Sequence, residues 1–147
     1  MKTHFKNVHT TKDIAISGAI TLAGVGLFFV NAGAGVLFVA CGLLSLIFYK
    51  TGYRIKNGDG TMFEKKAFDV DRSCRQSIKD FLDGKDINPE IAAPGYGGVA
   101  RMEVYFNKKA GVAYAQLFDF SNYVYEEATD IVELHSPRAE KLITKLL

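Results

Sequence analysis

Charged residues are absent from one long apolar stretch of the chain, residues 14–49. As a single helix its 36 residues would measure about 54 Å, whereas the hydrocarbon core of a bilayer is about 30 Å thick. A break is therefore required, and the segment 31–35, with Asn31 and two glycines, supplies one near the middle. The pattern predicts a transmembrane hairpin of two short helices, at about 14–30 and 35–49.

Basic residues flank this stretch on both sides, whereas the expected turn carries no charge. They are Lys2, Lys6 and Lys12 before it and Lys50, Arg54 and Lys56 after it. By the positive-inside rule both termini are cytoplasmic, so residues 1–13 form a cytoplasmic segment and residues 50–147 a cytoplasmic domain. The expected location is a membrane, which in a bacterium is the plasma or inner membrane.

A cleaved signal peptide is the competing interpretation of the same stretch. Residues 32–34 have the small-x-small form of a cleavage site, and a basic segment precedes the apolar run. A second apolar stretch follows this site at once, which favours the hairpin. No Asp, Glu, Lys, Arg or His lies within residues 14–49, which argues against a proton path or an ion-coupled transporter.

Small residues recur four apart on the first expected helix, at Ala15, Ala19 and Ala23. Such a stripe lets a second helix approach closely. We expect it to pack the two helices of the hairpin against each other. The alternative is a surface for oligomers or for a larger membrane partner.

The rest of the chain predicts a small α+β domain with the order ββαβββα. Alternating segments at 53–56 and 61–68 flank turn residues 57–60, and further strands are expected at 99–107 and 112–120. Residues 122–134 add one or two short strands.

Two amphipathic helices complete the expected domain, one at 71–83 capped by Asp69 or Asp71, the other opening at Ser136 and Pro137. The apolar faces comprise Val70, Cys74, Ile78, Phe81 and Leu82 in the first, and Ala139, Leu142, Ile143 and Leu146 in the second.

Composition excludes one class of partner. Residues 50–147 contain 15 basic and 15 acidic side chains, so the domain is neutral and lacks the basic face that nucleic acid requires. The three histidines, His4, His9 and His135, are not spaced with cysteines or carboxylates as metal ligands. No metal, cofactor or catalytic residue is therefore predicted.

Three weak chemical signals have simpler structural explanations. The segment 57–60 with Glu64 lacks the ligand spacing of a calcium loop and suits a hairpin turn. The glycines of 95–98 lead into a strand rather than a helix, so a connector is favoured over a phosphate loop. Cys74 and His135 would make a nucleophile and base only if the fold joined them; Cys74 is expected in the core.

An acidic and aromatic strip stands out near residues 119–133, which hold five acidic and no basic residues. The candidate interaction surface comprises Asp119, Phe120, Tyr123, Tyr125, Glu126 and Glu127. Exposed aromatics beside charges are typical of protein-binding surfaces. The alternative is a sheet whose aromatic side chains are simply half-buried.

Two short spans followed by a small β-rich domain resemble the membrane-anchored pleckstrin-like modules of bacteria. The helix expected at 71–83 interrupts the strand order of those modules, so nothing further is inferred from the resemblance. The leading hypothesis is a membrane-anchored accessory module that binds the bilayer and a protein partner or a second copy. The alternatives are a tethered domain binding a small ligand or lipid headgroup and, less favoured, a membrane-surface enzyme.

Overall fold

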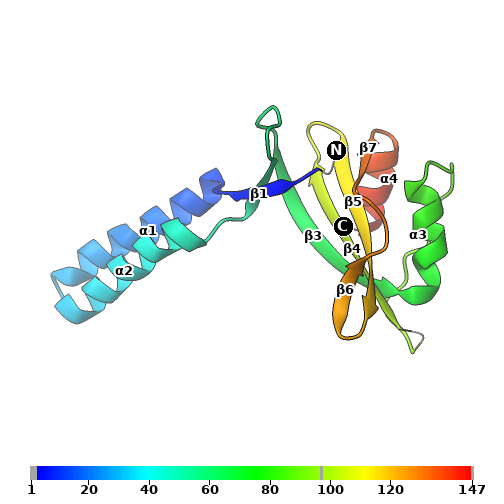
Figure 1. Cartoon of the computed structure of the whole chain (residues 1–147). Helices are drawn as coiled ribbons and strands as arrows, with labels where there is room; N and C mark the ends of the chain where they lie inside the picture. Colours follow the sequence, from blue (N-terminus) through cyan, green and yellow to red (C-terminus); the bar gives the residue numbers. More distant parts are fainter. Residues whose placement is uncertain (1–2, 97, 147) are drawn as a thin grey trace. The chain divides into compact units, whose positions relative to one another are not determined.

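The computed structural model describes residues 3–96 and 98–146, and the side chains within this range except that of Leu146. The chain divides into two compact units, the first comprising Phe5–Thr61 and the second beginning at Met62. The described residues form four α-helices and seven strands, and the recorded strand pairings are antiparallel (Figure 1). The α+β class predicted from the sequence is confirmed.

The first unit is a helical hairpin continued by two strands. Its elements are β1 (Phe5–Val8), α1 (Thr11–Phe28), α2 (Ala32–Phe48) and β2 (Gly52–Ile55). β1 pairs with β2 in a register that runs from Phe5 opposite Ile55 to Val8 opposite Gly52. The two ends of the helical hairpin therefore lead into one antiparallel ladder.

Capping residues fix where both helices begin. Thr10 and Asp13 form a capping box, in which Thr10 Oγ1 accepts from the Asp13 backbone N–H and Asp13 accepts from the Thr10 N–H. Asn31 caps α2, its Oδ1 accepting from the Ala34 N–H at 3.1 Å. Both helices thus begin three residues before the expected positions 14 and 35, and the connecting turn is shorter than 31–35.

The two helices touch through glycine and small polar residues. A Cβ atom on Gly24 would lie 2.6 Å from the Val39 nitrogen, on Gly35 2.6 Å from the Phe28 nitrogen, and on Gly42 2.8 Å from the Thr21 nitrogen. These three positions therefore allow no side chain while the backbones remain this close.

The alanine stripe lies elsewhere on α1. Ala15, Ala19 and Ala23 are exposed, while the buried residues of the helix are Asp13, Ser17 and Gly24. This differs from the expectation that the stripe packs the hairpin together. The interhelical contact uses another face because glycine brings the backbones closer than alanine does.

The second unit is a sheet with two helices on one face. Its elements are β3 (Met62–Asp71), a 3₁₀ turn (Arg72–Cys74), α3 (Arg75–Leu82), β4 (Val99–Asn107), β5 (Val112–Ser121), β6 (Val124–Glu127), β7 (Val132–His135) and α4 (Arg138–Leu146). β4 pairs with β3 and β5, while β6 and β7 pair with opposite ends of β5.

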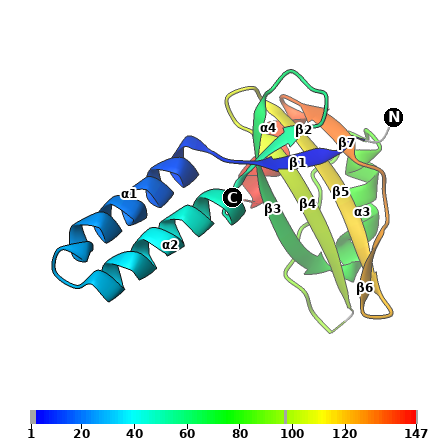
Figure 2. The same cartoon turned by 60° about the vertical axis from the view of Figure 1, so that its left-hand side comes forward.

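Figure 2 shows α3 and α4 on the same side of β4 and β5. The core between them is filled by side chains that alternate along the strands, as their period of two requires. Its fully buried members include Val70, Ile78, Phe81, Met102, Val104, Leu117, Leu134 and Leu142. Both predicted apolar helix faces, including Cys74, belong to this core; the Leu146 side chain lies outside the described part.

The observed order contains two strands beyond the predicted ββαβββα. β1 was missed because its four residues, Phe-Lys-Asn-Val, take a partner more than forty residues away. In the segment 122–134 two strands form, the upper of the two expected numbers. A loop separates them, where the Ala128 and Thr129 N–H groups donate to the Leu117 carbonyl at 2.8 and 3.2 Å.

Asp69 and Asp71 also differ from their expected roles. The strand β3 continues through both residues, because its pairing with β4 extends to Asp71 opposite Val99. Asp71 caps the 3₁₀ turn by accepting from the Ser73 N–H at 2.8 Å, and α3 follows this turn. Asp69 is a strand residue that faces Arg101.

Two glycine substitutions test the packing of the hairpin. Gly42→Ala forces the helices apart and should lower the unfolding free energy by about 1–3 kcal/mol, as overpacking does. Gly26→Ala is the matched control, since nothing lies within 4 Å of its added Cβ and alanine favours a helix. The measurement is SDS-induced unfolding of the full chain in mixed micelles, followed by far-UV circular dichroism. Equal effects of the two substitutions would contradict the observed interface.

Candidate interaction surface

The structure divides the predicted acidic and aromatic strip between the two faces of the sheet. Phe120 pairs with Tyr125 and Phe118 with Glu127, on the face turned away from α3 and α4, here called the far face. Asp119 pairs with Glu126 on the helix face. The strip is therefore not one continuous acidic surface.

On the far face, Tyr125 belongs to a cluster of side chains in contact with one another, which also contains Asp69, Arg101 and Phe120. Arg101 Nε and Nη2 donate to the two carboxylate oxygens of Asp69 at 2.8 and 3.3 Å. The Arg101 guanidinium lies 4.0 Å from the centroid of the Tyr125 ring. The ring centroids of Tyr125 and Phe120 are 5.0 Å apart. Tyr125 and Phe120 thus fit in part the alternative weighed from the sequence, aromatics half-buried on a sheet.

Asp119 has a structural partner on the helix face. Its Oδ2 lies 2.6 Å from Arg75 Nη2, at the first residue of α3. This ion pair joins α3 to β5, so the Asp119 charge is already compensated within the unit.

Three exposed aromatic or aliphatic residues lie in or beside the turn between β5 and β6. Asn122 and Tyr123 have φ values of 50° and 63°, which makes a two-residue hairpin turn with both central residues left-handed. Tyr123 is 95% exposed, the following Val124 60%, and Phe120 40%. We call Phe120, Tyr123 and Val124 the β5–β6 tip.

Tyrosine is an unusual residue at this position. The left-handed conformation costs a residue with a Cβ about 1–2 kcal/mol, which is why glycine is favoured in such turns. The Tyr123 side chain is almost fully exposed, so its burial within the unit does not offset this cost. The sequence predicted a strand region that included residues 122 and 123, because the Asn-Gly pair typical of this turn is absent.

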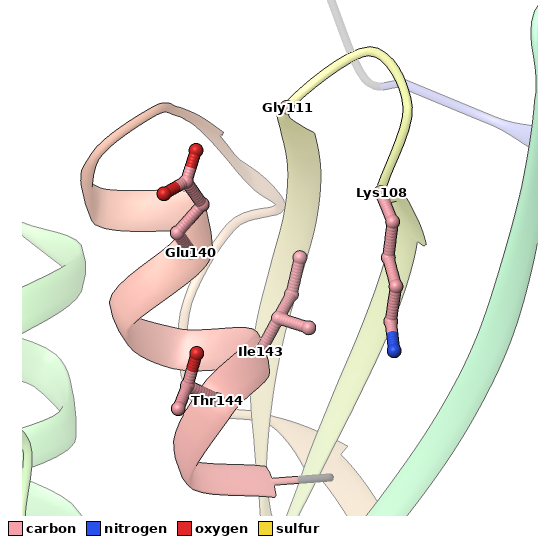
Figure 3. A pocket seen from close by; sticks show the side chains of 5 residues that line it. All are labelled: Lys108, Gly111, Glu140, Ile143 and Thr144. Atoms are coloured by element: carbon pink, nitrogen blue, oxygen red, sulfur yellow. The ribbon is translucent and has the colours of Figure 1, made fainter.

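A second feature is a shallow hollow of about 280 Å³ at one end of the sheet (Figure 3). Its lining residues are Lys108 and Gly111 near the β4–β5 turn and Glu140, Ile143 and Thr144 on α4. Between the sheet and the helices, by contrast, Met102, Leu117 and Leu142 are fully buried.

Cys74 and His135 lie toward opposite ends of the sheet. Arg75, the neighbour of Cys74, reaches Asp119, whereas His135 pairs with Val112. Asp119 and Val112 are seven residues apart along β5, which corresponds to about 23 Å. Cys74 is also buried in the core, so the two side chains do not form a nucleophile and base.

The other weak chemical signals resolve into local structure. Asp59 Oδ1 accepts from the Thr61 N–H at 2.9 Å, as a turn residue does. The Gly95 N–H donates to Asp71 Oδ2 at 2.8 Å, which ties the loop before β4 to the end of β3. Among the residues described, no group of three or more His, Cys, Asp or Glu could hold a metal ion.

A polar seam inside the hairpin was not predicted from the sequence. Asp13 is buried, and its carboxylate accepts from the Thr51 N–H at 2.9 Å and from Thr51 Oγ1 at 2.7 Å. One turn further, Ser45 Oγ donates to Ser17 Oγ at 2.6 Å. The spacing of Asp13, Ser17, Thr21 and Gly24 on one helix face was the available signal.

Comparison with known protein families, curated proteins and solved structures finds no match to this chain.

The Asp69–Arg101 pair gives a measurable electrostatic prediction. Hydrogen bonds from Arg101 lower the pKa of the Asp69 carboxyl group, chiefly through the side-chain contact. Because the folded-state pKa is lowered, the pair stabilises the unit above the ordinary aspartate pKa. This contribution is lost as the pH falls through the lowered value.

Arg101→Met should return the pKa of Asp69 toward its ordinary range, as measured by carboxyl ¹³C NMR titration. Asp59 is the internal control, because hydrogen bonds from Thr61 lower its pKa and Arg101 plays no part. An unchanged Asp69 titration in this variant would show that the pair is absent in solution.

Proposed function

We propose that this chain is a membrane-anchored interaction module. The helical hairpin spans a bilayer, both termini are cytoplasmic, and the second unit presents a surface to a protein partner. No nucleic acid or cofactor enters this proposal.

The observation that carries the membrane part is the inverted polarity of the hairpin. Its buried positions in α1 and α2 are Asp13, Ser17, Gly24, Gly35 and Gly42. Its large apolar side chains are exposed, among them Ile14, Leu22, Val25, Phe28, Val36, Leu37, Leu43, Leu44, Ile47 and Phe48. A water-soluble protein rarely exposes a continuous apolar surface of this extent, whereas lipid solvates it.

Helix dimensions agree with a span. The 18 residues of α1 and 17 of α2 correspond to about 27 and 26 Å, close to the hydrocarbon thickness of about 30 Å. By its length and hydropathy, α1 is a candidate membrane span. The apolar helix α2 is one residue shorter than α1. A core helix of a soluble protein would be mostly buried, but only 17% of α1 is.

Orientation follows from the basic residues on both flanks of the hairpin and from the uncharged turn. In the proposed orientation Val30 lies outside and the second unit in the cytoplasm.

The interaction part is supported by the β5–β6 tip. Three exposed aromatic or aliphatic side chains, one of them in a costly backbone conformation, lie together at one end of a well-packed unit. Large exposed aromatic residues of this kind are frequent anchors in protein interfaces.

The alternative of a tethered ligand-binding domain is favoured by one observation, the hollow beside α4. Its lining includes the oppositely charged Lys108 and Glu140, on either side of Ile143 in the view of Figure 3. Its shallow form makes it a weaker candidate than the tip, because most small-molecule sites enclose their ligand.

Thiol labelling in intact cells tests the orientation. In a chain with Cys41 and Cys74 replaced by alanine, Val30→Cys should react with a membrane-impermeant reagent. Lys109→Cys, exposed in the β4–β5 turn, should react only after permeabilisation. Labelling of Lys109→Cys in intact cells would place the second unit outside, and a missing N-terminal segment would indicate a cleaved signal peptide.

Purification of the full chain from native membranes in a mild detergent tests the interaction part. A stoichiometric protein partner should accompany the wild-type chain. Absence of both a partner and self-association would count against an interaction module.

A further inference from the structure

Tyr123 has an unusual backbone conformation. Its φ of 63° lies in the left-handed region, where a tyrosine is disfavoured and glycine is the usual residue of this turn. The side chain is 95% exposed. Folding alone would favour glycine here, so the tyrosine is explained by something outside the second unit.

The surroundings of Tyr123 define a compact apolar end. Val124 follows it on the helix face and Phe120 precedes it on the far face, both exposed. The Phe120 ring is held against Tyr125, which itself lies over Arg101. This support makes the base of the tip rigid, so little conformational freedom is lost when a partner binds.

Charge specifies what kind of partner fits. Of the five acidic side chains in residues 119–133, Asp119 is paired with Arg75, and Glu133 lies opposite Tyr114, at the other end of β5 from the tip. Glu126 and Asp130 are exposed. Arg75 and Arg101, the basic residues in contact with Asp119 and Tyr125, are each paired with an aspartate, so Glu126 and Asp130 leave the β6 side of the tip acidic. It repels both an anionic membrane and the same surface on a second copy.

We propose that Tyr123 is the anchor of the binding surface and that it enters an apolar cleft bordered by lysine or arginine on a protein partner. The inference rests on the proposed function as an interaction module, and it names the site and the chemistry of the partner. Phe120 and Val124 pack around the anchor, and Glu126 faces the basic border.

The first experiment separates stability from binding with Tyr123→Gly in the full-length chain. Glycine relieves the backbone, so the thermal midpoint of the second unit should rise by about 3–6 °C. Recovery of the partner in mild detergent should fall at least tenfold. An unchanged recovery with the stabilised variant would overturn the assignment, because it would show that the tyrosine contributes nothing to binding.

The second experiment locates the contact. A photo-crosslinking phenylalanine derivative is placed at position 123 in cells, with Lys109 in the other turn as the matched control position. We expect one protein adduct from position 123, mapped to apolar residues flanked by Lys or Arg. Glu126→Lys should lower the yield of this adduct several-fold. A Lys→Glu change in the partner, at the mapped border, should restore the yield. Adducts with lipid alone, with a second copy or with an uncharged site would overturn the proposal.

The two hypotheses fail in different ways. A partner that crosslinks from position 109 but not from 123 would reject the tip while leaving the interaction module intact. No adduct from either position, together with no partner in the purification, would reject the interaction module itself.

Discussion

The close approach of α1 and α2 determines the character of the whole first unit. Because Gly24, Gly35 and Gly42 leave no room for a side chain, the helices meet backbone to backbone. The large apolar side chains then have nowhere to lie except outside. The result is a pair of helices with a polar and glycine interior and an apolar exterior, the reverse of a soluble helical pair. The proposed anchoring of the chain depends on this reversal.

At the end of the hairpin opposite its turn, Asp13 links the two helices. Its carboxylate accepts hydrogen bonds from Thr10 at the start of α1 and from Thr51 beyond α2, so one buried group joins the entry and exit of the hairpin. β1 and β2 then continue as a ladder from these points. In the second unit apolar side chains are buried and charged ones are exposed. Apolar residues form the core between sheet and helices, and charged pairs such as Asp69–Arg101 lie on the far face.

Local patterns in the sequence predicted much of this architecture. The uncharged stretch, the alternation in β4 and β5 and the apolar faces of α3 and α4 all depend on neighbouring residues, and each corresponds to an observed element. Features that depend on distant pairing were missed, including β1, the seam from Asp13 to Thr51, and the extension of β3 through Asp69. The strip at 119–127 was found as a composition, but only the strand register divides it into the Arg75 partner Asp119, the Arg101 cluster and the exposed Tyr123.

Spin-label accessibility can show whether lipid covers the exposed apolar surface of the hairpin, on which the proposed anchoring depends. Nitroxides are attached at Leu22, Leu37 and Leu43, all exposed, and at Lys109 as the reference, in a cysteine-free chain reconstituted into vesicles. If lipid covers the hairpin, nitroxides at its three sites collide readily with oxygen and rarely with a water-soluble nickel complex, while the nitroxide at Lys109 does the opposite. Nickel collisions at the hairpin sites as frequent as at Lys109, or shielding from both reagents, would contradict it.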